Sequence, residues 1–131
     1  MAKIERFEDI KAWQEARELT QNVYQITRNN GFAKDFGLRE QVQRAAVSVM
    51  ANIAEGFDSG SNREFIKFLG YALRSATGLQ SHLYVALDQA YLDKQDFERL
   101  FASTIKCKNL ISGFIRYLRS YPRSQTLNIE L

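Results

Sequence analysis

The chain has 131 residues, of which 45% are apolar and 25% charged, with 7 glycines, 1 proline, 1 cysteine and 1 histidine. This length suits one domain, and the single cysteine excludes both an intramolecular disulfide and a zinc site built on thiolates. The net charge of +3 permits an anionic partner without requiring one. The start of the chain lacks the apolar core of a signal peptide, and no uncharged run reaches the length of a membrane span. We therefore expect a cytoplasmic protein with no membrane segment, cofactor or metal.

The first expected helix covers residues 9–28, because apolar residues recur there at steps of three and four. They are Trp13, Ala16, Leu19, Val23 and Ile26. Residues 29–31 (NNG) are a stop signal, since Asn and Gly tolerate the left-handed conformation at a helix end. The second expected helix covers residues 38–55, with Gly56 as its end signal. Its apolar stripe consists of Leu38, Val42, Ala45, Val49 and Ile53.

The third expected helix covers residues 61–90 and begins with a capping box, in which Ser61 and Glu64 satisfy each other's backbone N–H groups. Its apolar stripe continues as far as Ala90. The fourth covers residues 93–121 and is ended by Pro122. Four helices of similar length with short connections predict an all-α, antiparallel up-down-up-down four-helix bundle. The whole chain is then a single domain, with its core in residues 7–121 and a mobile tail in residues 122–131.

Two segments resemble a known family of bacterial four-helix bundles. They are residues 7–16 (FEDIKAWQEA) and residues 37–56, in which NIAEG at 52–56 follows RAA at 44–46 at a specific distance. Over nearly the whole chain the sequence resembles the 23S rRNA intervening-sequence proteins, a family that includes accessory variability proteins of diversity-generating retroelements. The sequence departs from the family pattern at Met50, where a proline is common, and at Gly78, where a glutamate is common.

The resemblance implies a ring-like homo-oligomer, commonly a homopentamer, without enzymatic activity. Retroelement members of the family bind nucleic acid and a reverse transcriptase, so the implied partners of this chain are its own copies, RNA or DNA, and a reverse transcriptase. The resemblance suggests no cofactor.

The second expected helix carries a polar stripe beside its apolar one. The stripe follows helical steps of three and four and consists of Gln41, Arg44, Ser48, Asn52 and Glu55. No charged residue lies between Arg44 and Glu55, and the small Ala51 and Ala54 lie in this stretch. A helix with so little charge is usually covered on more than one side, which favours a subunit interface. The alternatives are a self-satisfied polar network that includes Arg44 and Glu55, or the lining of a partner site.

Several other residues are explained by structural roles more simply than by catalysis or ligand binding. His82 has no second histidine and no Glu at the spacing of a di-iron site, and no nucleophile elbow occurs, which argues against a ferritin-like site or a hydrolase. Residues 56–61 lack the Lys-Ser/Thr ending of a phosphate-binding loop, so we expect a plain connection. Cys107 is expected to fill the core. Four tyrosines lie at stripe edges and suit an interface better than base stacking: Tyr71, Tyr84, Tyr91 and Tyr117.

The fourth expected helix carries a basic face without any acidic residue between its first and last members. This basic face consists of Arg99, Lys106, Lys108, Arg116, Arg119 and Arg123. It is either a solvated surface or, when repeated around an oligomer, a contact for nucleic-acid phosphates. The sequence therefore predicts a non-enzymatic, homo-oligomeric accessory or scaffold protein that binds nucleic acid. The alternative is a protein-only adaptor that presents repeated docking faces to a partner protein.

Overall fold

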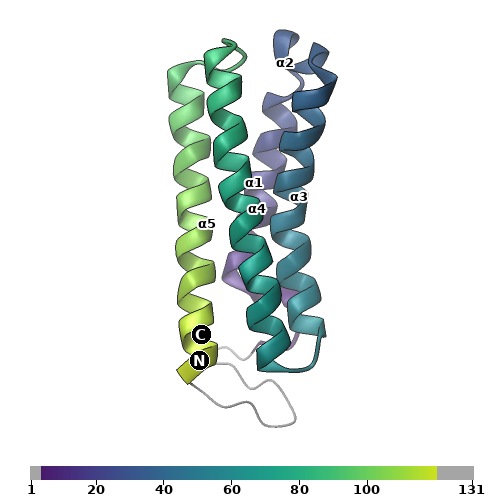
Figure 1. Cartoon of the computed structure of the whole chain (residues 1–131), viewed down its shortest axis with the longest axis vertical. Helices are drawn as coiled ribbons and strands as arrows, with labels where there is room; N and C mark the ends of the chain where they lie inside the picture. The colour runs from purple at the N-terminus through teal and green to yellow at the C-terminus, as the bar shows by residue number, and fades with distance from the viewer. Residues whose placement is uncertain (1–3, 121–131) are drawn as a thin grey trace.

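The computed structural model describes residues 4–120 and contains four long helices arranged side by side (Figure 1). They are α1 (Lys11–Ile26), α3 (Phe36–Asp58), α4 (Asn62–Asp88) and α5 (Lys94–Ser120). A 3-10 helix, η1 (Phe7–Asp9), precedes α1, and a short helix, α2 (Asn30–Lys34), lies between α1 and α3. No strand occurs within residues 4–120, which confirms the all-α prediction. The expected tail at 122–131 lies outside the described residues.

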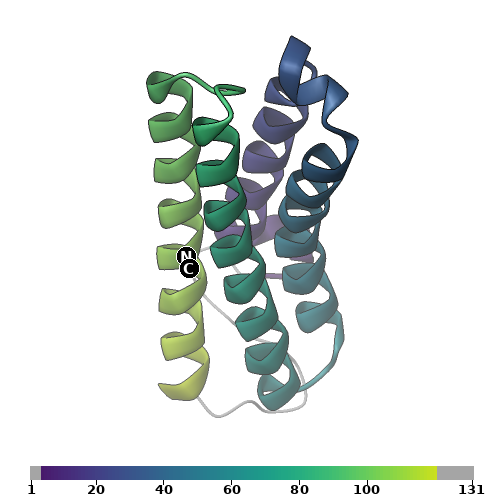
Figure 2. The ribbon, with the colours of Figure 1, turned by 45° about the horizontal axis from the view of Figure 1, so that its top comes forward.

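Successive long helices run in opposite directions, as Figures 1 and 2 show. Helix α1 packs against α3 and α5, and α4 packs against the same two helices, so the four helices form a closed square. This is the up-down connection order expected from the short loops.

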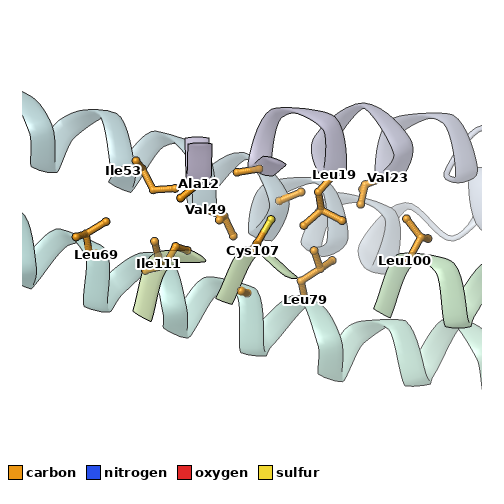
Figure 3. Close-up of a cluster of buried hydrophobic side chains, with 14 of the residues drawn as sticks. Ala12, Leu19, Val23, Val49, Ile53, Leu69, Leu79, Leu100, Cys107 and Ile111 are labelled. Carbon is orange, nitrogen blue, oxygen red and sulfur yellow. The ribbon is translucent and has the colours of Figure 1, made fainter. Parts of the chain in front are cut away.

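The core lies along the axis of this bundle, where each long helix contributes one apolar stripe (Figure 3). Leu19 of α1, Ile53 of α3, Leu79 of α4 and Ile111 of α5 are all at most 1% exposed. Burying an aliphatic side chain of this size contributes about 1.5–3 kcal/mol. The predicted stripes are therefore largely confirmed.

Three residues of the first two predicted stripes lie nearer the surface than expected. Trp13 and Leu38 are half-buried and pack against the edge of the core. Ala45 is also half-buried, and its neighbour Ala46 is fully buried instead. The backbone C=O of Ala46 accepts a hydrogen bond from Thr20 of α1 at 3.2 Å, which places this side of α3 against α1.

Gly56 does not end its helix, which corrects the sequence prediction. Helix α3 continues to Asp58, and Gly56 is buried inside it. A Cβ atom at this position would lie 2.8 Å from the Cβ of Phe68 and 2.9 Å from Cδ1 of Phe65. The glycine is therefore required by the close approach of α4, and not by a left-handed backbone.

The connection between α1 and α3 is more ordered than the stop signal at residues 29–31 suggested. Helix α1 ends at Ile26, and α2 follows directly, burying Phe32 completely. Asp35 then caps α3 by accepting a hydrogen bond from the backbone N–H of Leu38 at 3.1 Å. This cap explains why α3 begins at Phe36, two residues before the predicted start.

The turn between α4 and α5 corrects the predicted end of the third helix. Helix α4 ends at Asp88, and Ala90 is exposed with a φ of +60°. Ala90 is thus part of the turn and not of the apolar stripe. Asp93 accepts a hydrogen bond from the backbone N–H of Asp96 at 2.7 Å, which caps the start of α5. At the other end of α4, Ser61 accepts one from the backbone N–H of Glu64 at 3.2 Å, as its capping role predicts.

Candidate functional site

The centre of the polar stripe lies against α4. The Ser48 hydroxyl is 2.8 Å from the hydroxyl of Ser75, and the Asn52 amide donates to the backbone C=O of Ser48 at 2.9 Å and to its hydroxyl at 3.0 Å. These short side chains let the two helices approach closely. Part of the stripe is therefore a small hydrogen-bonded network between α3 and α4.

The charged ends of the stripe do not belong to this network. Arg44 is exposed and forms an ion pair with Glu40, one turn earlier in α3. Gln41 and Glu55 are exposed as well. The hypothesis of a buried network that joins Arg44 to Glu55 is therefore wrong for this chain. Both side chains are exposed, although the residues between them are uncharged.

Two uncharged stretches lie beside this network, and because α3 and α4 are antiparallel, the two stretches are side by side only near Ser48 and Ser75. We call the outward side of residues 45–54 in α3 and residues 75–87 in α4 the charge-poor face, because neither stretch contains Asp, Glu, Lys or Arg. Val47, Tyr84 and Val85 are 41%, 51% and 44% exposed. Ala51 and Ala54 are half-buried in this face. The Tyr84 ring packs on Phe97 and Phe101 of α5, with ring centres 5.0 and 5.6 Å apart, whereas no ring contact or core packing accounts for Val47 and Val85.

Gly78 lies on the charge-poor face in the middle of α4. A Cβ atom built on it would meet no atom within 4 Å, so nothing in the described part of the chain requires a glycine there. Glycine in a helix interior costs about 0.5–1 kcal/mol relative to alanine. The contrast with Gly56, where the packing leaves no room for a Cβ, shows that Gly78 has no such role within the bundle.

Two cations of the basic face of α5 form ion pairs with acids that lie outside the stretch from Arg99 to Arg123. The Lys106 ammonium is 2.8 Å from a carboxylate oxygen of Glu15 in α1, and this carboxylate raises the pKa of Lys106. Arg99 is 3.4 Å from Asp96 of its own first turn. Lys108 is half-buried and donates to the side-chain carbonyl of Gln80 at 3.2 Å.

Two cations of this face remain available near the end of α5. Arg116 and Arg119 are exposed, and neither forms an ion pair within the described part of the chain. Arg123 lies outside the described residues. Of the described part of the predicted basic face, Arg116 and Arg119 are therefore the two cations that are both exposed and without an ion pair.

The four tyrosines expected at an interface have separate environments. The Tyr91 hydroxyl donates to Asp35 at 3.0 Å, its ring packs on Phe32, and the hydrogen bond to this carboxylate raises the pKa of Tyr91. Tyr117 is half-buried beside Phe114. Tyr71 packs on Phe68 and Tyr84 packs on Phe97 and Phe101, and both rings keep an exposed side that suits an interface.

The residues with possible catalytic chemistry are not gathered into a site. Cys107 is fully buried, and burial raises its pKa to about 12, so the thiol stays protonated at neutral pH. His82 is half-buried on α4, and within residues 4–120 no group of three His, Cys, Asp or Glu side chains could hold a metal ion. None of the described helices is long and apolar enough to cross a bilayer.

Sequence reasoning missed a polar hollow of about 380 Å³ where the end of α1 meets α2 and the start of α3. We call it the arginine hollow, and its lining consists of Tyr24, Thr27, Arg28, Ala33, Arg39 and Gln43. These residues come from segments whose contact depends on the tertiary fold, and no motif connects them. A second cavity of about 260 Å³ lies between α1 and α5 and is mainly apolar.

The fold and these surfaces define a small helical bundle whose distinctive features are outward faces and not an enclosed site. The family model of the 23S rRNA-intervening sequence protein matches residues 8–113. The chain therefore belongs to the family of 23S rRNA-intervening sequence proteins, as the motifs at residues 7–16 and 37–56 predict.

A crystal structure of a protein of unknown function from Bacteroides thetaiotaomicron, assigned to the S23 ribosomal protein family, has the same fold. It superposes with a TM-score of 0.73 at 22% sequence identity and covers 80% of this chain and 98% of its own. No curated protein matches the sequence at a significant level.

Proposed function

We propose that the protein is a non-enzymatic scaffold that associates with copies of itself through the charge-poor face. It binds nucleic acid through cations that lie outside this contact. The observation that carries the proposal is the uneven distribution of charge over the bundle. A helix face that meets water normally carries charged residues. Two uncharged stretches of adjacent helices, with Val47 and Val85 exposed, offer surface suited to burial against protein.

The small residues of this face support close packing between copies. A neighbouring helix can approach the backbone at Ala51, Ala54 and Gly78, where nothing larger than a methyl group projects. The space beside Gly78, which no described atom of the chain fills, would then be occupied by the neighbouring copy. We propose a closed ring, and the family resemblance suggests five subunits.

The nucleic-acid contact is proposed at Arg116 and Arg119. Two unpaired cations bind phosphate weakly, but a ring repeats them, and several weak contacts on one polyanion raise the overall affinity. Such binding falls steeply with salt because counterions are released from the phosphates. The family resemblance also suggests a reverse transcriptase as a protein partner of the assembly.

Titration of fluorescent RNA and DNA at several salt concentrations tests this function. We expect binding that weakens with salt, and loss of binding when Arg116→Glu and Arg119→Glu are combined, with the oligomer intact. The matched control combines Arg17→Glu with Lys94→Glu, which changes the net charge equally. Arg17 is exposed within α1 and Lys94 is exposed in the first turn of α5, so both lie away from Arg116 and Arg119.

A protein-only adaptor is the second candidate, and the ion pairs on the basic face favour it. Pairing of Lys106 with Glu15 and of Arg99 with Asp96 lowers the positive potential that a polyanion would meet. If the protein binds no nucleic acid at low salt, or binds it with no dependence on salt, the nucleic-acid function is contradicted and the adaptor is favoured.

A further inference from the structure

The arginine hollow lies at the end of the bundle where α1 finishes and α3 begins. Because α5 runs antiparallel to α1, Arg116 and Arg119 lie toward the opposite end of the molecule (Figure 1). Arg28 and Arg39 line the hollow together, and no acidic residue is part of its lining. The hollow is therefore a concentration of positive charge separate from the basic face of α5.

The acids closest in sequence are engaged elsewhere. Asp35 caps α3 and accepts the hydroxyl of Tyr91, and Glu40 pairs with Arg44. Neither Arg28 nor Arg39 forms an ion pair within residues 4–120. Two guanidinium groups on one hollow repel each other, and an anion bound between them would relieve this repulsion.

Arg39 is held in position before any ligand arrives. Its guanidinium donates to the backbone C=O of Ala33 at 2.8 Å and lies over the ring of Phe36, 4.8 Å from the ring centre. The floor of the hollow is also fixed, since the Gln43 amide donates to the Thr27 hydroxyl at 3.0 Å. Fixed donors lose little conformational entropy when they bind, so this arrangement favours binding of an anion.

Exposed aromatic rings lie beside these cations. Phe36 is 66% exposed although it belongs to an ordered helix, and Tyr24, which lines the hollow, is 38% exposed. An exposed phenylalanine contributes nothing to the core. Next to arginines it offers a flat surface on which an unpaired base can stack, which is the combination typical of single-stranded nucleic-acid binding.

We propose that the arginine hollow and Phe36 form a subsite for single-stranded nucleic acid. Arg28 and Arg39 bind a backbone phosphate in the hollow, and the adjacent base stacks on Phe36. This proposal rests on the nucleic-acid-binding function proposed above and adds both the form of the strand and a second point of contact. Duplex nucleic acid presents no free base to Phe36 and is bound less tightly.

The test measures the affinity of the full chain for a fluorescent ten-nucleotide single strand, as RNA and as DNA, and for the matching duplex, at three salt concentrations. Phe36→Leu should weaken single-strand binding at least about fivefold without changing duplex binding, and Phe36→Trp should preserve it. Arg28→Ala with Arg39→Lys should weaken binding about tenfold and reduce its dependence on salt. Arg28→Ala alone, at an exposed side chain, guards against a folding defect.

The matched control is Arg17→Ala, since Arg17 is an exposed arginine within α1 that lines neither the hollow nor the end of α5. The subsite is contradicted if Phe36→Leu and Arg28→Ala change single-strand affinity no more than Arg17→Ala does. Millimolar inorganic phosphate at constant ionic strength should weaken strand binding, because it competes for the same two arginines. Loss of binding only in the Arg116→Glu, Arg119→Glu variant contradicts this subsite and leaves the proposed function standing.

Discussion

The α3–α4 side and the α1–α5 side of the bundle are alike in their buried residues and differ in the charge of their outer surfaces. Both sides bury a continuous apolar stripe. On the outside, α1 and α5 carry many charged residues, some of them paired between the two helices, as Lys106 and Glu15 are. Residues 45–54 and 75–87 carry none. The core makes the same demands on all four helices and does not explain this difference, whereas the proposed contact between copies does.

The largest effect on the α3–α4 side is expected at Gly56. Gly56→Val should destabilise the fold by about 1–3 kcal/mol or more, because its side chain would collide with Phe65 and Phe68. Urea unfolding measures the change. Gly70→Ala is the control: it meets no atom within 4 Å, so it should be neutral or stabilising by up to about 1 kcal/mol. Equal effects of the two variants would contradict the close approach of α3 and α4.

The next effect concerns assembly. Ala51→Glu or Ala54→Arg should lower the mass of the assembly, because each variant places an unpaired charge in a contact between copies. The chain itself should stay folded, since both positions are only half-buried within it. Ala102→Glu, at an exposed position of α5, is the control and should leave the mass unchanged. A mass that does not respond to Ala51→Glu would place the contact elsewhere.

Smaller effects should separate the two parts of the polar stripe. Ser75→Ala removes a partner of Ser48 between α3 and α4 and should cost about 0.5–1.5 kcal/mol. Arg44→Ala and Glu55→Ala should each change the free energy of unfolding by less than about 0.5 kcal/mol, because both side chains are exposed. Thermal melts compare the three variants. If Arg44→Ala lowered the free energy of unfolding more than Ser75→Ala, the charged ends of the stripe would stabilise the fold more than its centre, contrary to this prediction.

The smallest effect is expected for thiol labelling of Cys107 in the folded protein. This measurement tests whether the core shared by both sides stays closed. Burial raises its pKa to about 12 from an ordinary value of 9.0, so at pH 8 the thiol is protonated and covered in the folded chain. A thiol reagent should label it at pH 8 only after urea unfolds the protein. The raised pKa also predicts that stability falls as the pH rises above 9, where only the unfolded thiol ionises. Rapid labelling of the folded protein would show that the core opens.

Periodicity was enough to predict the core, because Leu19, Ile53, Leu79 and Ile111 repeat with the helix itself. It did not predict features that depend on contacts between helices. Gly56 has the sequence pattern of a helix end, and only the position of Phe65 and Phe68 shows that it is a packing requirement.

The candidate surfaces were harder to predict for the same reason. The basic face was defined along one helix, and its neutralisation by Glu15 arises from a helix about 90 residues away in the sequence. The arginine hollow joins the end of one helix to the start of another through α2, a segment that had been interpreted as a stop signal. The lack of charge on α3 is visible in the sequence because it lies within one helix, whereas the position of residues 75–87 beside α3 depends on the fold.

The central claim is that copies of the chain cover the charge-poor face, and the mass of the protein in solution tests it most directly. Light scattering on the eluted peak of a sizing column, at micromolar concentration, should give a single species of several times 15.1 kDa. A monodisperse species of 15.1 kDa would contradict this claim, because Val47 and Val85 would then stay exposed to water.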